Sequence, residues 1–350
     1  MPEGDSVYRT AALLREALAG KVLTRSDLRV PRFATADLTG RTTLEVVSRG
    51  KHLLIRLSGP SGPSGPDPAD PPLSGPGGPG PSDPPPGRPG RPGRPGPADP
   101  PPGGPGRPDP ADPPPGGPGG PGPSDPPPRT PHRPTDRLTL HTHLRMDGAW
   151  RVFANADATG TGTGTAATPA TAGGHRHEVR VLLATATHTA VGYRLPVVEL
   201  LRTIDEHRAV GHLGPDLLGP DWDAEAAAAN LLAGPGRPLG EALLDQRNLA
   251  GIGNIYKAEL CFLARITPWT PVGDIPRATL PRLTAAAHRL LDANKDRRRN
   301  TTGSRRPGQD LFVYGRAHRP CLRCGTPVRE APQDGRPTYW CPRCQSGPTP

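Results

Sequence analysis

The sequence lacks any apolar run of about eighteen residues, the least that a membrane-spanning helix needs. Its first five residues, Met-Pro-Glu-Gly-Asp, contain neither the basic region nor the apolar core of a secretory signal peptide, so we expect a cytoplasmic protein. Cysteine is scarce, with five in 350 residues, and four of these fall in two tight pairs near the end. This distribution excludes a secreted disulfide framework and favours metal ligands in a reducing compartment.

Acidic residues are outnumbered. The chain has 33 Asp and Glu against 43 Lys and Arg, a net charge of +10, and an isoelectric point near 9.9. A basic surface attracts polyanions, so nucleic acid is the first partner to consider and a membrane surface the second.

Proline and glycine are abundant, with 53 and 45 residues, and their excess is local. The segment 58–135 holds 33 of the prolines and 19 of the glycines and has almost no apolar side chains. It cannot bury enough surface to offset the entropy lost on ordering, so we predict a disordered, polyproline-II-rich insert. A second insert, rich in Thr, Gly and Ala, is expected at 158–174. Because loop-closure entropy grows only logarithmically with length, the fold can continue across both.

Outside the inserts, the apolar pattern separates a strand-rich half from a helical half. Apolar residues at helical spacing predict a first helix over 7–18, with Asp5 or Ser6 as its N-cap and Gly20 just beyond its end. Alternating apolar residues predict short strands within 22–57, 138–153 and 178–186. From residue 223 the spacing becomes helical, and helices are expected over 224–233, 239–245, 254–264 and 280–293.

The cysteine pairs have the spacing of a zinc ribbon, Cys321-x2-Cys324-x16-Cys341-x2-Cys344. Four thiolates complete a zinc tetrahedron and leave no position for a reactive water, so we predict one structural Zn²⁺. The fifth cysteine, Cys261, lies between apolar neighbours and is expected to be a buried core thiol.

Two further segments are candidates for contact with a polyanion. In 245–259, Gly251 and Gly253 separate two helical stretches, and backbone amides at the start of the second could hold a phosphate, with Asn254 or Lys257 adding a contact. Taken alone, a segment of this kind is more often an ordinary core-packing turn. Arg336, in a basic and aromatic hairpin between the cysteine pairs, could enter a DNA groove or be a solvated surface arginine.

Five motifs follow one another along the chain: Met1–Asp5, Arg49–Leu54, His143–Gly148, Asp245–Glu259 and Cys321–Gln345. Their order is the one seen in the formamidopyrimidine-DNA glycosylase and endonuclease VIII family, and the chain resembles these DNA repair enzymes over nearly everything except the two inserts. The Pro-Glu-Gly start and the Thr338–Gln345 tail look most like the endonuclease VIII branch.

The resemblance implies an α+β multidomain fold. Residues 1–215 would form a catalytic two-sheet β-sandwich flanked by helices and interrupted by the two inserts. Residues 223–300 would form a helix-two-turn-helix DNA-binding domain, and residues 311–350 a zinc finger. The sequence patterns described above are compatible with this division.

The resemblance also implies that Met1 is removed and that the amine of Pro2 is the nucleophile. An α-amino group titrates at about 7.7–8.0, against about 10.4 for lysine, so it is more often unprotonated near neutral pH. Glu3 would act as general acid and base, and Lys51 would contact the phosphate and sugar at the lesion. Where the family often has a second acidic residue, three positions after Glu3, this chain has Ser6, and Asp5 is a possible replacement.

On the DNA side, the resemblance implies that the target base is flipped out of the duplex. Met146 and Arg336 would fill the gap that it leaves, and Asn254 would grip the phosphate beside the lesion. Lys257 is a further candidate contact.

The implied function is that of a monomeric, bifunctional DNA glycosylase and AP lyase of base excision repair. It would act on damaged DNA and remove oxidised bases, pyrimidines in preference, by β,δ-elimination. Met146 matches the formamidopyrimidine branch and supports the alternative of a purine-preferring enzyme. A third possibility is a non-catalytic zinc-ribbon DNA-binding protein, but binding alone does not require Pro2, Glu3 and Lys51 together.

Overall fold

The structure is a computed structural model that describes residues 2–59, 137–155 and 175–350. The insert predicted at 58–135 lies outside the described residues except for Ser58 and Gly59, and the insert predicted at 158–174 lies wholly outside them.

The strands of the N-terminal half form two four-stranded antiparallel sheets, ordered β1-β6-β7-β5 and β2-β3-β4-β8. Strands β3 and β4 flank the first insert and pair directly, with His52 opposite His143, so the sheet continues across it as predicted. The strands are β1 (Arg25–Leu28), β2 (Thr43–Arg49), β3 (His52–Leu57), β4 (Leu138–His143), β5 (Ala149–Ala154), β6 (Val179–Ala184), β7 (His188–Tyr193) and β8 (Val197–Arg202).

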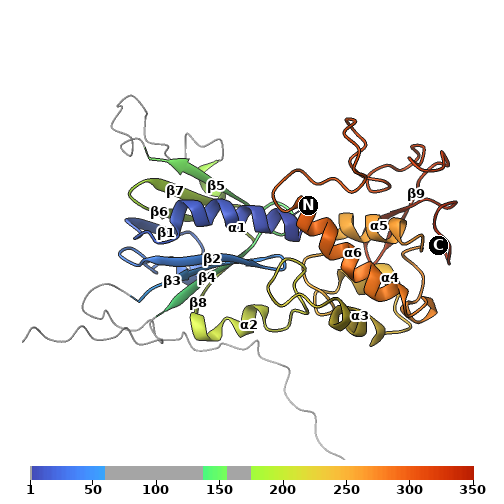
Figure 1. The fold of residues 1–350 in the computed structure, drawn as a ribbon. Coiled ribbons are helices and arrows are strands. Elements are labelled where there is room, and N and C mark those ends of the chain that lie inside the picture. Colours follow the sequence, from blue (N-terminus) through green and yellow to red (C-terminus); the bar gives the residue numbers. More distant parts are fainter. Residues whose placement is uncertain (1, 60–136, 156–174) are drawn as a thin grey trace, which may run out of the picture. The chain divides into compact units, whose positions relative to one another are not determined.

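One apolar core joins the two sheets to helix α1 (Gly4–Leu18), which runs alongside them (Figure 1). Alternation places every second residue of a strand in this core, as in β3 with Leu53, Ile55 and Leu57. Leu140 of β4 and Leu183 of β6 come from the two different sheets and belong to the same cluster. The two-sheet sandwich flanked by a helix is therefore confirmed.

The predicted N-cap of the first helix was wrong. Helix α1 begins at Gly4, with Glu3 at the cap position, and Asp5 lies buried in the first turn. The carboxylates of Glu3 and Asp5 bind groups of the C-terminal half, so neither serves α1 as a conventional cap. At the other end the prediction holds, since Gly20 follows the helix with a φ of +74°.

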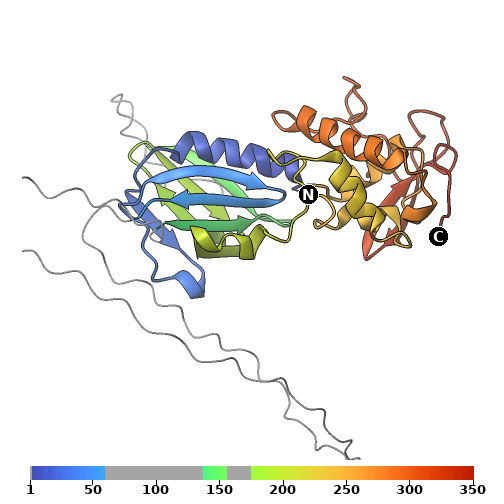
Figure 2. The same cartoon turned by 60° about the horizontal axis from the view of Figure 1, so that its bottom comes forward.

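The C-terminal half contains the four helices expected from the sequence, which bury a second core (Figure 2). They are α3 (Ala224–Leu232), α4 (Leu239–Leu244), α5 (Asn254–Leu263) and α6 (Thr279–Asn294). Asp223 caps α3 by accepting hydrogen bonds from the amides of Glu225 and Ala226 at 2.9 and 3.0 Å. The short helix α2 (His207–Val210) and strands β7 and β8 were not predicted.

The last element is a hairpin of β9 (Arg329–Gln333) and β10 (Arg336–Trp340). Asp334 and Gly335 have φ values of +47° and +66°, the conformation of a tight two-residue hairpin turn. Side chains of the finger pack against Phe262 of α5. None of the helices in the described parts of the chain has the length and apolar character that a membrane crossing needs.

Candidate active site

Three segments that are far apart in the sequence meet at the N-terminal end of α1. The amide of Gly4 donates a hydrogen bond to the carbonyl of Gly251 at 2.9 Å. The turn between β2 and β3 reaches the same place, because a Cβ added to Gly50 would lie 2.9 Å from that of Ala250. The buried carboxylate of Asp216 holds this turn by accepting a 2.8 Å hydrogen bond from the Gly50 amide. The chain start, the Gly50–Lys51 turn and the turn before α5 thus form one corner.

Glu3 is the centre of this corner and is fully buried. Its carboxylate accepts hydrogen bonds from the amides of Gly253, Ile255 and Tyr256 at 3.0, 2.8 and 3.2 Å. An anion is favoured there because these free amides mark the N-terminus of α5. The sequence analysis considered a phosphate as a possible ligand of amides at this helix start; in the structure the amides of Gly253, Ile255 and Tyr256 donate to the chain's own carboxylate.

Only glycine fits at position 253. A Cβ on Gly253 would lie 2.5 Å from Cδ of Glu3, far closer than an ordinary contact. We expected Gly253 to leave backbone amides accessible. It also allows the carboxylate of Glu3 to approach the start of α5.

Lys51 faces the same corner. Burial lowers the pKa of its amine to about 8, while the negative charge of Glu3 opposes this shift and the positive charges of Arg336 and Arg299 add to it. Pro2, bonded to Glu3, is partly exposed. The three residues for which the family resemblance implies catalytic roles therefore lie at the same corner, with the Lys51 amine within electrostatic reach of the buried Glu3 carboxylate.

Two of the predicted DNA contacts, Asn254 and Lys257, connect α5 to strand β10. The Lys257 ammonium donates a 2.6 Å hydrogen bond to the hydroxyl of Thr338, and the Asn254 amide donates one of 2.8 Å to the carbonyl of Pro337. Both side chains are buried, and burial lowers the pKa of Lys257 to about 8. Lys257 therefore links helix α5 to strand β10 of the finger, and its ammonium group is buried.

The other two predicted DNA contacts are exposed. Arg336 directly follows the tight turn of the hairpin. Met146 lies in the turn between β4 and β5 and is 59% exposed, although methionine usually fills cores. Both are therefore accessible to a partner.

A histidine cluster on the polar face of β3 and β4 was missed by the sequence analysis. Nδ1 of His52 lies 2.8 Å from Nε2 of His141, and Nδ1 of His141 lies 2.8 Å from a carboxylate oxygen of Glu199. Burial, together with nearby positive charge, lowers the pKa of His52 to about 3 and that of His143 to about 4, so both rings are neutral at pH 7. The alternation of His141 and His143 along one strand was the available signal.

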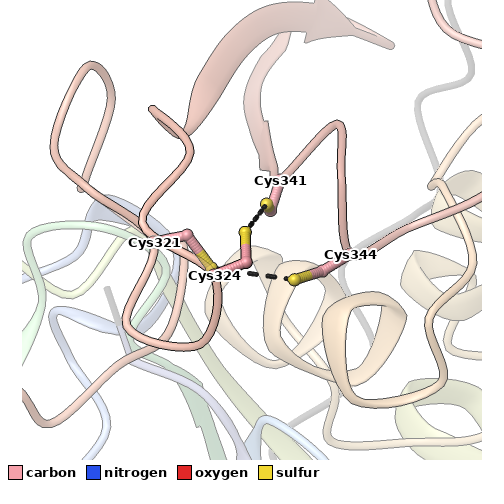
Figure 3. Close-up of side chains that lie close together, drawn as sticks. All are labelled: Cys321, Cys324, Cys341 and Cys344. Carbon is pink, nitrogen blue, oxygen red and sulfur yellow. Dashed lines mark hydrogen bonds between the residues drawn. The ribbon is translucent and has the colours of Figure 1, made fainter.

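The four predicted zinc ligands converge in the finger (Figure 3). The four sulfur atoms lie within 4.8 Å of one another, with 3.9 Å between Cys321 and Cys344 and 3.5 Å between Cys324 and Cys341. Four thiolates without a carboxylate or histidine suit a closed structural metal site. Cys261 is buried in α5 and belongs to the second core, as predicted.

Two family models match the C-terminal half. The formamidopyrimidine-DNA glycosylase H2TH domain matches residues 213–304, and the zinc finger found in FPG and IleRS matches residues 319–347.

Relatives and solved structures extend this likeness to the whole chain. A probable endonuclease 8 2 of Streptomyces coelicolor is 50% identical over all of this chain and 96% of its own length. The DNA-(apurinic or apyrimidinic site) lyase Nei2 of Mycolicibacterium smegmatis is 38% identical over 99% of each chain. A formamidopyrimidine-DNA glycosylase of Lactococcus lactis, solved with DNA that contains an AP site, has the same fold, with a TM-score of 0.62 at 19% identity over 99% of this chain and 100% of its own.

The fold, the corner around Glu3 and these likenesses define a DNA glycosylase with AP lyase activity. The chain belongs to the formamidopyrimidine-DNA glycosylase and endonuclease VIII family.

Proposed function

We propose that this protein removes oxidised bases from DNA, pyrimidines in preference, through an imine on Pro2 and then cuts the strand by β,δ-elimination. The observation that carries the proposal is the corner itself: Glu3 is fully buried against the start of α5, Pro2 is its neighbour, and Lys51 faces it. A protein that only binds DNA has no need of a buried carboxylate next to its N-terminal amine.

In the proposed reaction the unprotonated secondary amine of Pro2 attacks C1′ of the damaged nucleotide. The bond from C1′ to the base breaks, and the base leaves with its electron pair and gains a proton. Opening of the sugar ring gives an imine between Pro2 nitrogen and C1′. Loss of the C2′ proton then breaks the C3′–oxygen bond, and a second elimination breaks the C5′–oxygen bond, which leaves phosphate at both ends of the gap.

Glu3 is the proposed proton carrier. The three amides that bind its carboxylate hold it beside Pro2, where it can accept a proton during sugar opening and return it later. Lys51 is proposed to contact the phosphate and sugar, because its amine is still mainly charged below its pKa of about 8.

We propose that damaged DNA lies across both halves of the chain. Met146 and Arg336, both exposed, would fill the space left by the flipped base. Asn254 would bind the phosphate beside the lesion, with Lys257 as a further contact. Both side chains donate hydrogen bonds to strand β10, so they also position the hairpin that carries Arg336. The excess of basic residues supports such binding.

The proposed organisation is a monomer, with a catalytic domain over 1–215, a DNA-binding domain over 223–300 and a finger over 311–350. One structural Zn²⁺ would be held by the four cysteines and would fix the β9–β10 hairpin that carries Arg336. The chemistry needs no metal at the Glu3 corner. We expect the protein to act on chromosomal DNA in the cytoplasm.

Borohydride trapping on a duplex with one abasic site tests the proposal. The wild type should give a covalent adduct that maps to Pro2, and the cleaved strands should carry 3′ and 5′ phosphates. Glu3→Gln should reduce the adduct. A form with an uncleaved N-terminal extension should give none, because its Pro2 nitrogen is an amide.

Absence of an adduct from wild-type protein that binds the duplex tightly would overturn the enzymatic proposal in favour of the DNA-binding alternative. Duplexes with an oxidised pyrimidine or with 8-oxoguanine decide the base preference, and faster release of the purine would overturn that part of the proposal.

A further inference from the structure

Arg299 lies in the segment after α6 and reaches back to the first turn of α1. Its Nε donates a 2.9 Å hydrogen bond to Asp5, and its Nη2 bonds the other oxygen of the same carboxylate. The guanidinium lies over the ring of Tyr256 in α5, 4.8 Å from the centroid. Nη1 is 4.0 Å from Oε1 of Glu3. One side chain thus contacts the chain start, the candidate general base and the helix that holds it.

The environment of this contact is closed to solvent. The Arg299 side chain is 12% exposed, and those of Asp5 and Glu3 are fully buried. Burial alone would lower the pKa of Arg299, but the hydrogen bonds to Asp5 and the charge of Glu3 raise it, so the group stays a cation. The two-pronged contact fixes the orientation of the guanidinium as well as its charge.

Asp5 is fully engaged by these contacts. Besides Arg299, it accepts a 3.2 Å hydrogen bond from the Tyr256 hydroxyl and hydrogen bonds of 2.7 and 3.2 Å from the amide and hydroxyl of Ser6. A second cation, Arg9, lies farther away, with its Nη1 3.9 Å from Oδ2 of Asp5. The Asp5 carboxylate is therefore committed to structural contacts, chiefly the two-pronged one with Arg299. This speaks against Asp5 as a replacement for the family's second acidic residue in a proton relay.

We infer that Arg299 is a positioning residue: by gripping Asp5 and standing beside Glu3, it fixes the first turn of α1, and with it Pro2, against the start of α5. The inference rests on the proposed function. The cation also places positive charge between two fully buried carboxylates, those of Glu3 and Asp5, within one closed corner. Lys51 and Arg336 bring positive charge to this corner from other elements.

The neighbouring Arg298 provides a matched control. Its side chain is 86% exposed and pairs with Asp310 at 2.9 Å, away from the corner. Arg299→Gln and Arg298→Gln remove the same charge from adjacent positions. The rate of borohydride-trapped adduct formation should be measured in single turnover with enzyme in excess, together with the Kd for the same abasic duplex.

We expect Arg299→Gln to slow adduct formation about a hundredfold, the effect of a misplacement of about 1 Å, and to change Kd by less than about threefold. Arg298→Gln should trap at the wild-type rate. Arg299→Lys should recover part of the rate, because it keeps the charge and loses the two-pronged contact. An Arg299→Gln protein that traps at the wild-type rate would overturn the inference.

The double variant Asp5→Asn/Arg299→Gln separates positioning from stability. Each single change leaves a buried charge without its partner, whereas the double change removes both, so the double variant should be more stable than Arg299→Gln. Under our inference its Tm recovers while adduct formation stays slow. Recovery of both would mean that Arg299 matters only for folding.

The wild-type reaction distinguishes failure of the inference from failure of the proposed function. A wild-type chain that forms no adduct overturns the Pro2 mechanism and the role of Arg299 with it. Normal trapping by the wild type and equally fast trapping by Arg299→Gln overturn the inference alone.

Discussion

Gly253→Ala tests the geometry of the candidate active site without replacing any of the proposed catalytic residues. The added Cβ would lie 2.5 Å from Cδ of Glu3, whereas ordinary contacts begin at 3.4 Å, so the carboxylate or the start of α5 must shift by about 0.9 Å. Overpacking of this kind costs roughly 1–3 kcal/mol of folding free energy. A displacement of about 1 Å at a catalytic group costs on the order of a hundredfold in rate. We therefore expect a folded protein with a severe loss of activity.

The assay is single-turnover borohydride trapping, with Tm and the Kd for abasic DNA measured in parallel. Gly236→Ala is the matched control, because a Cβ at that exposed position in the same half meets nothing within 4 Å. Glu3→Asp is shorter by one methylene, so the double variant Glu3→Asp/Gly253→Ala should regain stability without regaining rate. Wild-type trapping by Gly253→Ala would refute the claim that this contact sets the position of Glu3.

Three further predictions concern other parts of the molecule. The pKa of Lys51, which burial lowers to about 8, implies that its charge is lost as the pH rises from 7 to 9; DNA affinity at fixed salt should fall over that range, and Lys51→Arg, measured by fluorescence anisotropy, should largely abolish the fall. Cys341→Ser should lower the zinc content, measured by elemental analysis, below the one ion per chain expected for the wild type, whereas Cys261→Ala should leave it unchanged; equal zinc in both would exclude the four-cysteine site. Met146→Ala should change stability by less than about 0.5 kcal/mol, because the side chain is 59% exposed, yet slow base release from duplex DNA; an unchanged rate would remove Met146 from the set of gap-filling residues.

Much of the fold follows from local patterns. Helices α3 to α6 have apolar residues at helical spacing and clear breaks between them, and the structure places them close to the predicted ranges. Strands β3 and β4 were identified from the apolar pattern on either side of the first insert, and the structure pairs them directly. Strand β8 was missed because its inward side chains are only partly buried at a sheet edge, and the segment 197–202 has no strong alternation.

The metal site was predictable because its ligands come in two short pairs whose spacing is itself the signal. The cysteines need only one hairpin to meet, and a hairpin is a local structure. By contrast, the Asp5–Arg299 ion pair joins residues that are 294 positions apart, and nothing near either of them indicates the other. Contacts of this range follow from the way the two halves pack, which local patterns do not encode.

The group that the amides at the start of α5 bind could not be predicted from local sequence patterns either. The two glycines and the helix start correctly indicated amides able to bind an anion, but the sequence alone does not say which anion arrives. A phosphate and a buried glutamate make equal use of the helix N-terminus. The glutamate takes the place here because the Gly4 amide bonds to the Gly251 carbonyl and brings the chain start within reach. The helix start thus holds a carboxylate next to the proposed nucleophile.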